Sequence, residues 1–289
     1  MHLRRYATAS EFLAAAQGWL MREESANNLL LSFASRRAVQ DPIGAHDYYA
    51  TVSEGRDICL AATVGQDGGV LLGGGDRQAL RLLTRDLASR NLRPQGVVGE
   101  AGAAAHFAER FGAETGAQVA PRHRLKHLAL YTLPLPPVVP GDLRDASPAD
   151  LPLVEDWWAH FRQETRTPGQ LRDLVAAVAS RIPGRGIVLW CVPEPVAMAA
   201  YTLLQPDTAR LSAVFTASEA RKQGYASALV AQLSRRLMLH GADDPRPRRA
   251  CFLSTDAHNP VSNAIYEHIG YREQGEHLHL DFVYSEAQG

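Results

Sequence analysis

The chain of 289 residues is long enough for two domains, and 46% hydrophobic with 21% charged residues is the balance of a soluble globular protein. A formal net charge of −1 excludes a whole-protein attraction to nucleic acid or to an anionic membrane. Three widely separated cysteines exclude a zinc-finger spacing, and no apolar run reaches the ~20 residues of a membrane helix. We therefore expect a cytoplasmic protein without a metal site and without nucleic-acid or membrane partners.

The first half of the chain alternates helical and extended patterns. Apolar residues three and four positions apart predict amphipathic helices over 10–20 and 79–92. A short apolar strand over 95–100 follows, and then a helix over 103–112 that ends at glycine. Strands that alternate with helices indicate an α/β protein with a mixed sheet.

A proline-rich segment, LPLPPVVPG, interrupts this order at residues 133–141. Four of its nine residues are proline, which fixes φ and removes backbone donors, so the segment suits neither a helix nor a central strand. We predict one domain over 1–132, a linker over 133–140 and a second domain over 141–289.

The second half repeats the order of elements in the first. Its predicted elements are helices over 148–161 and 168–182, hairpin strands 186–192 and 195–204, strand 209–216, a leucine-striped helix, strand 250–256 and helix 259–270. The matching order predicts an internal duplication.

A basic loop that contains glycine, Arg-Lys-Gln-Gly, separates strand 209–216 from the next helix. The first N–H groups of a helix have no partner within it and carry partial positive charge. Gly224 would let the backbone approach a ligand without a Cβ in the way, and Ser227 offers a hydroxyl. The arrangement suits a phosphate or pyrophosphate, although GxxxxGK(S/T) is absent and no GxGxxG follows the first strand.

Two separate stretches carry a resemblance to a known family. The loop RKQGYA has the form Q/R-x-x-G-x-G/A and resembles the acyl-coenzyme-A loop of the GNAT superfamily of N-acetyltransferases. Residues 255–271, TDAHNPVSNAIYEHIGY, resemble the next strand–helix unit of that superfamily, with Asn259 as helix cap, Pro260 at the first position and Gly270 at the exit. The resemblance predicts two domains of the acyl-CoA N-acyltransferase fold in tandem.

The resemblance implies that acetyl-CoA lies in a V-shaped opening between the strand that ends at Thr216 and the strand that ends near Asp256. An amine would attack the thioester directly, and a backbone N–H would stabilise the oxyanion. Tyr266 stands where the family commonly has the acid that protonates the leaving thiolate. The residues that this resemblance places at the donor are Val214, Phe215, Thr216, Arg221, Lys222, Gln223, Gly224, Tyr225, Ala226, Ser227, Asn259 and Asn263.

A general base is less evident, because strand 209–216 lacks the glutamate that the family often uses. Asp256 is our candidate catalytic carboxylate, and His258, Glu219, Asp207 and an ordered water remain alternatives. The expected function is the acetyl-CoA-dependent N-acetylation, or short-chain N-acylation, of a small-molecule primary amine. A non-catalytic acyl-CoA sensor and a peptide or protein N-acetyltransferase are the alternatives.

The first half matches the order of elements of this fold but lacks the residues that would bind the donor and protonate the thiolate. Gly73-Gly74-Gly75 stands where a phosphate loop would be, but Asp76 follows and would compete with a phosphate for the helix N–H groups. In a gapless match of the two halves, Ala108 takes the place of Tyr266. We therefore expect residues 1–132 to be a degenerate GNAT-like domain that does not bind the donor.

Two strand-like stretches carry histidines. His123 and His127 in PRHRLKH stand four apart, but arginine and lysine interleave with them and favour a solvated basic strand over a metal site. The alternating stretch 277–282, HLHLDF, predicts a strand whose histidines face solvent.

Overall fold

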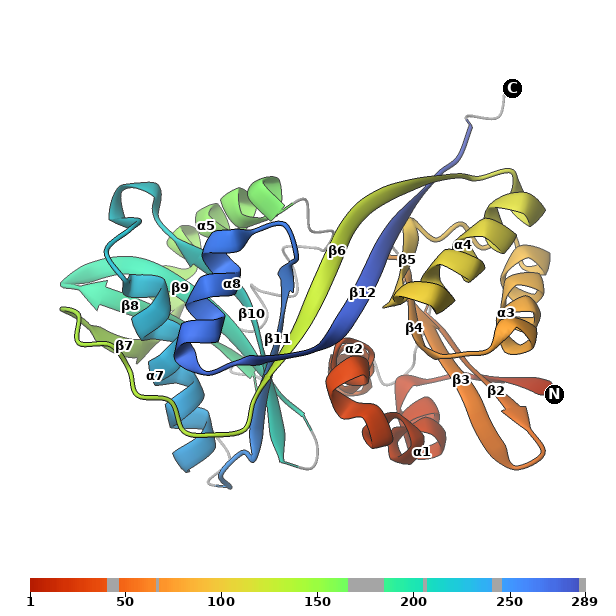
Figure 1. Cartoon of the computed structure of the whole chain (residues 1–289), viewed down its shortest axis with the longest axis horizontal. Helices are drawn as coiled ribbons and strands as arrows, with labels where there is room; N and C mark the ends of the chain where they lie inside the picture. Colours follow the sequence, from red (N-terminus) through yellow and green to blue (C-terminus); the bar gives the residue numbers. More distant parts are fainter. Residues whose placement is uncertain (41–46, 66–67, 166–184, 205–206, 241–245, 286–289) are drawn as a thin grey trace. The chain divides into compact units, whose positions relative to one another are not determined.

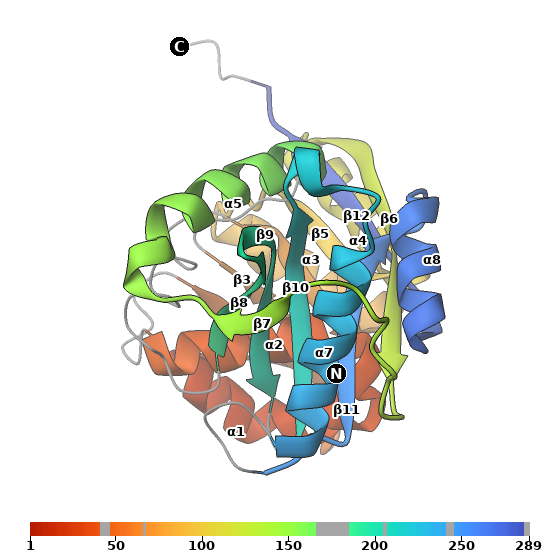
Figure 2. The same cartoon turned by 90° about the vertical axis from the view of Figure 1, so that its left-hand side faces the viewer.

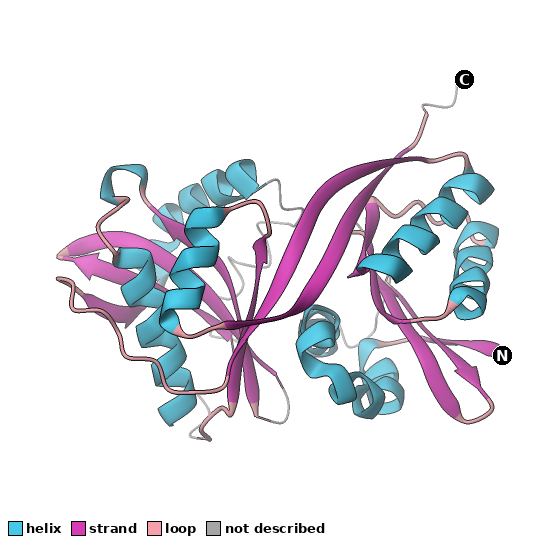
Figure 3. Ribbon diagram, in the orientation of Figure 1, coloured by secondary structure: helices cyan, strands magenta, loops and turns pink. Residues whose placement is uncertain are grey.

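The structure, a computed structural model, describes residues 1–40, 47–65, 68–165, 185–204, 207–240 and 246–285 (Figure 1). The helix predicted over 168–182 lies outside these residues. The chain forms two compact units, each an α/β assembly of helices packed on a sheet (Figure 3). Unit 1 comprises Met1–His127, Asp256–His258 and Gln274–Gly289, and unit 2 comprises Leu128–Thr255 and Asn259–Glu273.

Unit 1 is a mixed sheet with a pair of helices on each face. Its strands follow the order β1 (His2–Tyr6), β2 (Tyr48–Glu54), β3 (Asp57–Val64), β4 (Val70–Gly74), β5 (Gly96–Glu100), β12 (Arg272–Val283) and β6 (Gln118–Leu130). Its helices are α1 (Ala9–Leu20), the 3-10 turn Met21–Glu23, α2 (Glu24–Gln40), α3 (Arg77–Ser89) and α4 (Ala101–Thr115). Apolar side chains of α1 and α2 form one buried cluster with the sheet, and those of α3 and α4 form another. The helix predicted over 10–20 is thus found as α1, and the one over 79–92 as α3, which already ends at Ser89.

The last strand of the chain completes the core of unit 1. β12 pairs antiparallel with β5, in a register that places Leu280 opposite Val97. A Cβ on Gly96 would clash with the Leu280 carbonyl oxygen, so this close approach requires glycine. Residues 274–289 therefore group with the first half by contact, whereas the predicted domains 1–132 and 141–289 follow the sequence repeat and stay a prediction.

Three of the four histidines in β6 and β12 are buried, so the expectation that the histidines of 277–282 face solvent was wrong. His127, His277 and His279 are 5%, 7% and 8% exposed. The rings of His127 and His277 meet edge to face, with centroids 4.2 Å apart. Burial follows from pairing, because the strand at 277–282 is an interior strand of the sheet between β5 and β6.

We expect His279 to make folding sensitive to pH. Burial and the nearby Arg122 lower its pKa from 6.5 to about 4. The unfolded chain therefore binds a proton at this histidine near pH 6.5 while the folded chain does not, so stability is full above pH 6.5 and falls as the pH decreases towards 4. Relative to His279→Gln, the wild type should lose about 2 kcal/mol between pH 6.5 and 5 in urea unfolding. The exposed His258→Gln variant serves as control and should keep the wild-type slope, whereas equal slopes for wild type and His279→Gln would contradict the assignment.

Unit 2 repeats the same design around its own sheet. Beyond the end of β6, its strands follow the order β11 (Ala250–Asp256), β10 (Thr208–Thr216), β9 (Glu194–Leu204), β8 (Arg185–Val192) and β7 (Asp142–Asp145). Its helices are the 3-10 turns Pro148–Asp150 and Ser218–Ala220, α5 (Leu151–Thr165), α7 (Tyr225–His240) and α8 (Pro260–Ile269). α7 and α8 cover one face of the sheet, and α5 lies on the other (Figures 1 and 2). The predicted hairpin is confirmed, because β8 and β9 pair antiparallel.

Candidate functional site

Strands β10 and β11 of unit 2 separate after their first three residues. They pair in parallel only at Thr208–Arg210 with Ala250–Phe252, although β10 continues to Thr216 and β11 to Asp256. Beyond Arg210 and Phe252 the two strands no longer pair. The backbone of β10 from Leu211 onwards can therefore accept an added extended chain on this side.

A bulge on β10 lies at the same level. The register with β9 shifts between Ser212 and Phe215, and Ala213 has a φ of +52°, which is rare for a residue with a Cβ. Such backbone strain costs on the order of 1–3 kcal/mol and is concentrated at functional sites. The bulge turns the backbone groups of Ala213 and Val214 out of the regular ladder, next to the opening.

The basic loop after β10 has two left-handed residues. Lys222 has a φ of +63° and Gly224 a φ of +83°. Two side chains are tied back into unit 2, since Arg221 forms an ion pair with Glu164 at 2.6 Å and Gln223 Oε1 accepts a hydrogen bond from the Tyr225 hydroxyl at 3.0 Å. These bonds tether the Arg221 and Gln223 side chains of the loop. Successive amides in such a turn form a concave anion-binding surface.

Helix α7 begins at the end of this loop. The Ala228 N–H donates to the Gly224 carbonyl at 3.0 Å, the first hydrogen bond of the helix. The N–H groups of Tyr225, Ala226 and Ser227 precede it, so they cannot bond within the helix and they carry its positive end. The sequence prediction thus placed the helix start correctly.

Helix α8 has the caps that its sequence predicts. Asn259 Oδ1 accepts a hydrogen bond from the Ser262 N–H at 3.1 Å, and the Asn263 N–H donates to the Asn259 carbonyl. Gly270 ends the helix in the left-handed conformation, with a φ of +113°. The cap uses one oxygen of Asn259, and a role of its amide group in donor binding stays a prediction.

Tyr266 lies on the face of α8 that packs against the core. Its ring meets Tyr271 edge to face with centroids 6.0 Å apart, and only 8% of the residue is exposed. Burial raises the pKa of its phenol to about 12. The hydroxyl is therefore protonated at neutral pH and can donate a hydrogen bond.

Asp256, the last residue of β11, is held on both carboxylate oxygens. Oδ2 lies 2.9 Å from His123 Nδ1, and Oδ1 accepts from the His258 backbone N–H at 2.8 Å. Burial raises its pKa, but these hydrogen bonds outweigh burial and leave the pKa below its ordinary value. A carboxylate that binds protons this weakly is a poor base on its own, and it suits the orientation of His123 better.

The structure reduces the number of other side chains that could act as the general base. Asp207 is excluded, because it precedes the first residue of β10 and pairs with Arg249 at 2.9 Å. At ~3.3 Å per residue, Asp207 is roughly 30 Å from the strand end at Thr216. Glu219 lies in the turn after Thr216 and is exposed, and the His258 side chain is 79% exposed beside Asp256. These two stay predictions.

Two residues were not predicted from the sequence as part of the site. One is Arg210, at the point where β10 and β11 separate, and the other is His123, which contacts the last residue of β11. Arg210 lies on β10 at the last paired position, where its guanidinium donates to Ser254 Oγ of β11 at 3.3 Å and burial lowers its pKa to about 10. A cation inside an apolar strand was the available signal. His123 was the second residue that was missed. Its spacing from His127 in the same strand gave no indication of a contact with Asp256, which lies 133 residues later in the sequence.

The corresponding region of unit 1 is occupied by its own side chains. Asp76 Oδ1 accepts hydrogen bonds from the N–H groups of Gln78 and Ala79 at 2.9 and 2.8 Å, so the start of α3 is already capped by a carboxylate. A Cβ on Gly73 would meet Leu20 and Asn27 within 3 Å, which shows how closely α1 and α2 approach β4. These contacts support the proposal that residues 1–132 do not bind the donor.

Replacing Asp76 with alanine should lower stability without changing donor affinity. Loss of a helix N-cap costs about 1 kcal/mol, which urea unfolding measures. Asp76→Asn, which can still cap, is the matched control and should stay near the wild type. A change of acetyl-CoA affinity in Asp76→Ala would contradict a donor-free first half.

The chain resembles known proteins both in sequence and in structure. Residues 186–280 match the family described as FR47-like protein. Three solved structures resemble almost the whole chain: a Drosophila protein (16% identity, TM-score 0.69, 97% of this chain and 98% of that one), a GCN5-related N-acetyltransferase from Sphaerobacter thermophilus (15%, 0.62, 98% and 96%) and a tandem GNAT protein from the clavulanic acid biosynthesis pathway (14%, 0.59, 98% and 98%). The chain therefore has the GNAT fold.

The resemblance seen in the two sequence stretches is thereby confirmed, as is the GNAT fold in tandem. No match among curated proteins was found. No helix among the described residues is long and apolar enough to cross a membrane. Within the same residues, no three histidine, cysteine or acidic side chains come together as metal ligands would.

Proposed function

We propose that this GNAT protein is an acetyl-CoA-dependent N-acetyltransferase that transfers an acetyl or short acyl group to a primary amine of a small molecule. The observation that carries the proposal is the parting of β10 and β11 beside the bulge at Ala213, just before the anion-binding loop. An extended thioester arm fits an open strand edge, and a diphosphate fits the amides at the start of α7.

The proposed reaction is a direct transfer. The amine nitrogen attacks the thioester carbonyl carbon, the carbon–sulfur bond breaks, and the amide product forms. A backbone N–H at the bulge, from Ala213 or Val214, would stabilise the oxyanion that develops on the carbonyl oxygen. The Tyr266 phenol would donate a hydrogen bond or its proton to the leaving thiolate, for which its raised pKa keeps it in the protonated form.

The acceptor must also lose a proton. We assign Asp256 to this part of the reaction as a carboxylate that is ionised at neutral pH, because its pKa is lowered. His123 is the group that it orients, and the buried Nε2 of His123 has no hydrogen-bond partner among the described residues. The hydrogen bond between Asp256 and His123 holds the imidazole ring in a fixed orientation.

A panel of amines and amino acids, assayed with acetyl-CoA by the release of free thiol, tests this function. Turnover of at least one small amine is the expected result. Binding of acetyl-CoA in calorimetry without thiol release on any amine or peptide would instead identify a non-catalytic sensor. Turnover restricted to peptides would identify a peptide or protein N-acetyltransferase.

A further inference from the structure

Helix α3 of unit 1 carries three arginines on its exposed face. Arg77, Arg81 and Arg85 follow one another four residues apart, so their side chains leave the same side of the helix at intervals of about 6 Å. All three are exposed to solvent, and none of them forms a hydrogen bond, an ion pair or a ring contact within the part of the chain that the structure describes. We refer to these three residues as the arginine row.

The carboxylate of α3 does not neutralise the arginine row. Asp86 is the one acidic residue of this helix, and it pairs with Arg5 at 3.0 Å and with Arg90 at 3.3 Å. The Tyr48 hydroxyl also donates to Asp86, at 2.9 Å. The negative charge of α3 is therefore already bound by other side chains, and the arginine row is left as a purely cationic face.

The energetics of an isolated helix disfavour the arginine row. Like charges at positions i and i+4 repel one another, and Arg77 with Arg81 and Arg81 with Arg85 are two such pairs. Arg77 also occupies the first position of α3, where the end of the helix already carries partial positive charge. Departures from local rules of this kind are expected mainly at functional sites. The arginine row therefore indicates a negatively charged partner that relieves the repulsion.

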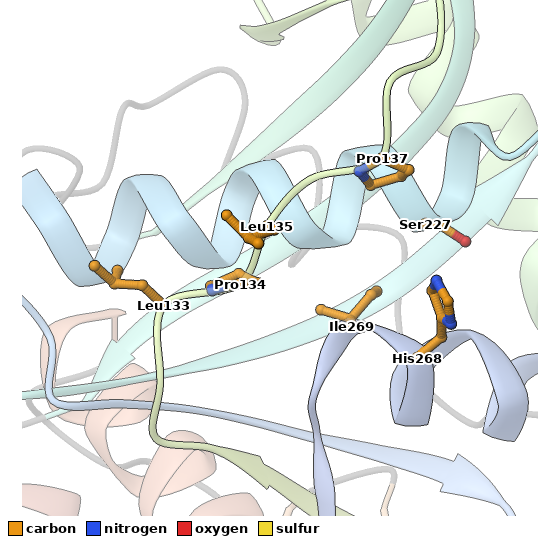
Figure 4. A pocket seen from close by; sticks show the side chains of 7 residues that line it. All are labelled: Leu133, Pro134, Leu135, Pro137, Ser227, His268 and Ile269. Atoms are coloured by element: carbon orange, nitrogen blue, oxygen red, sulfur yellow. The ribbon is translucent and has the colours of Figure 1, made fainter.

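The same residues line a cavity of about 360 Å³ at the surface of α3. Its lining consists of Arg77, Gln78, Arg81, Leu82 and Arg85. A cavity in unit 2 beside the proline-rich segment is different, because its lining is mainly apolar and its polar side chains are Ser227 and His268 (Figure 4). A partner at α3 therefore needs several negative charges and one apolar group to cover Leu82.

We propose that the arginine row is a docking surface for an acidic helix of a partner protein. Carboxylates four residues apart on a helix also repeat at about 6 Å, so a helix laid along α3 pairs one carboxylate with each guanidinium. An apolar side chain between two of these carboxylates covers Leu82. The formal net charge of −1 gives the whole chain no attraction to nucleic acid, which makes an acidic helix the better match. The inference does not rest on the proposed function, because it concerns residues of unit 1 alone.

Fluorescence anisotropy on the full chain, without acetyl-CoA, tests this assignment. The probe is a labelled alanine-rich peptide of about 18 residues that carries three glutamates four residues apart and a leucine between two of them. The wild type should bind it at low salt, and the affinity should fall about ten-fold when about 0.5 M salt screens the charges. The same peptide with glutamine in place of glutamate should not bind.

Variants of the arginine row separate docking from general charge. Arg81→Gln should weaken peptide binding about five-fold, and replacement of all three arginines with glutamine should abolish it. Because Arg81→Gln removes both like-charge pairs, the Tm of the free chain should rise by about 2 °C. Arg56→Gln is the matched control, because Arg56 is an exposed arginine in the turn between β2 and β3 and lies outside the cavity. It should bind the peptide like the wild type.

Four results would overturn the inference. They are no binding of the glutamate peptide by the wild type at low salt, wild-type affinity in the triple variant, an equal loss of affinity in Arg56→Gln, and tighter binding of an oligothymidylate than of the peptide. The last result would identify the partner as a nucleic acid. A lower Tm in Arg81→Gln would contradict the argument that the arginine row reduces the stability of the free chain.

Discussion

Replacing Gly224 with glutamate is expected to weaken acetyl-CoA binding on the order of 100-fold. The new side chain would bring a negative charge to the start of α7, where the amides are proposed to hold the diphosphate. It would also place a Cβ at a φ of +83° and 3.2 Å from Val139. Loss of one or two charge-assisted hydrogen bonds, at about 1.5–3 kcal/mol each, accounts for a change of this size. Calorimetric titration with acetyl-CoA measures it.

Gly116→Glu is the matched control for this change. Gly116 ends α4 of unit 1 with a φ of +74°, and nothing lies within 4 Å of the Cβ position. The control therefore carries the same backbone strain and the same added charge at a place without a proposed ligand. It should keep wild-type affinity. Binding by Gly224→Glu within about two-fold of the control would refute the placement of the diphosphate at this loop.

Tyr266→Phe is expected to lower kcat about 100-fold with little change in donor affinity. Removal of a general acid typically costs a factor of at least ~100 in rate. The phenyl ring still fills the site beside Tyr271, so the fold of α8 should persist. Because burial raises the pKa of Tyr266 to about 12, the wild-type rate should not fall through ionisation of this group between pH 7 and 10. Initial rates and donor titrations across this range separate the two effects.

Tyr271→Phe removes a neighbouring hydroxyl and serves as the control. The Tyr271 hydroxyl lies 2.8 Å from Ser234 Oγ in the core, so its loss should cost about 1 kcal/mol of stability and leave kcat unchanged. An unaltered kcat in Tyr266→Phe would remove the proposed acid from the mechanism. An equal fall of kcat in both variants would show that packing, rather than proton donation, is responsible.

The chain's local signals predicted the elements of the site well. Asn259, Pro260 and Gly270 mark the start and end of α8 because capping depends on hydrogen bonds within a few residues. Gly224 marks the turn before α7 because a left-handed φ favours glycine. Lys222 shares that conformation without any such signal, since its backbone is held by the surrounding loop.

Contacts between segments that are far apart in the sequence could not be predicted from such local signals. The hydrogen bond between His123 and Asp256 joins residues 133 positions apart, and no periodic pattern within either strand encodes it. The same holds for the burial of His277 and His279, because an alternating strand looks alike at a sheet edge and between two neighbours. Asp207 was a plausible base by composition, and only its position before β10 excluded it.

By itself, the sequence determined the order of the described strands and helices in the second half, the caps of α8 and the glycine turn before α7, since each of these depends on neighbouring residues. Two of its motifs also indicated the GNAT fold. The tertiary structure decided which strand completes which sheet, where β10 and β11 separate and which side chains lie against Asp256 and Gly224. Those features depend on pairing between segments far apart in the chain, where the free energy comes from burial and hydrogen bonds that form only when the whole fold is assembled.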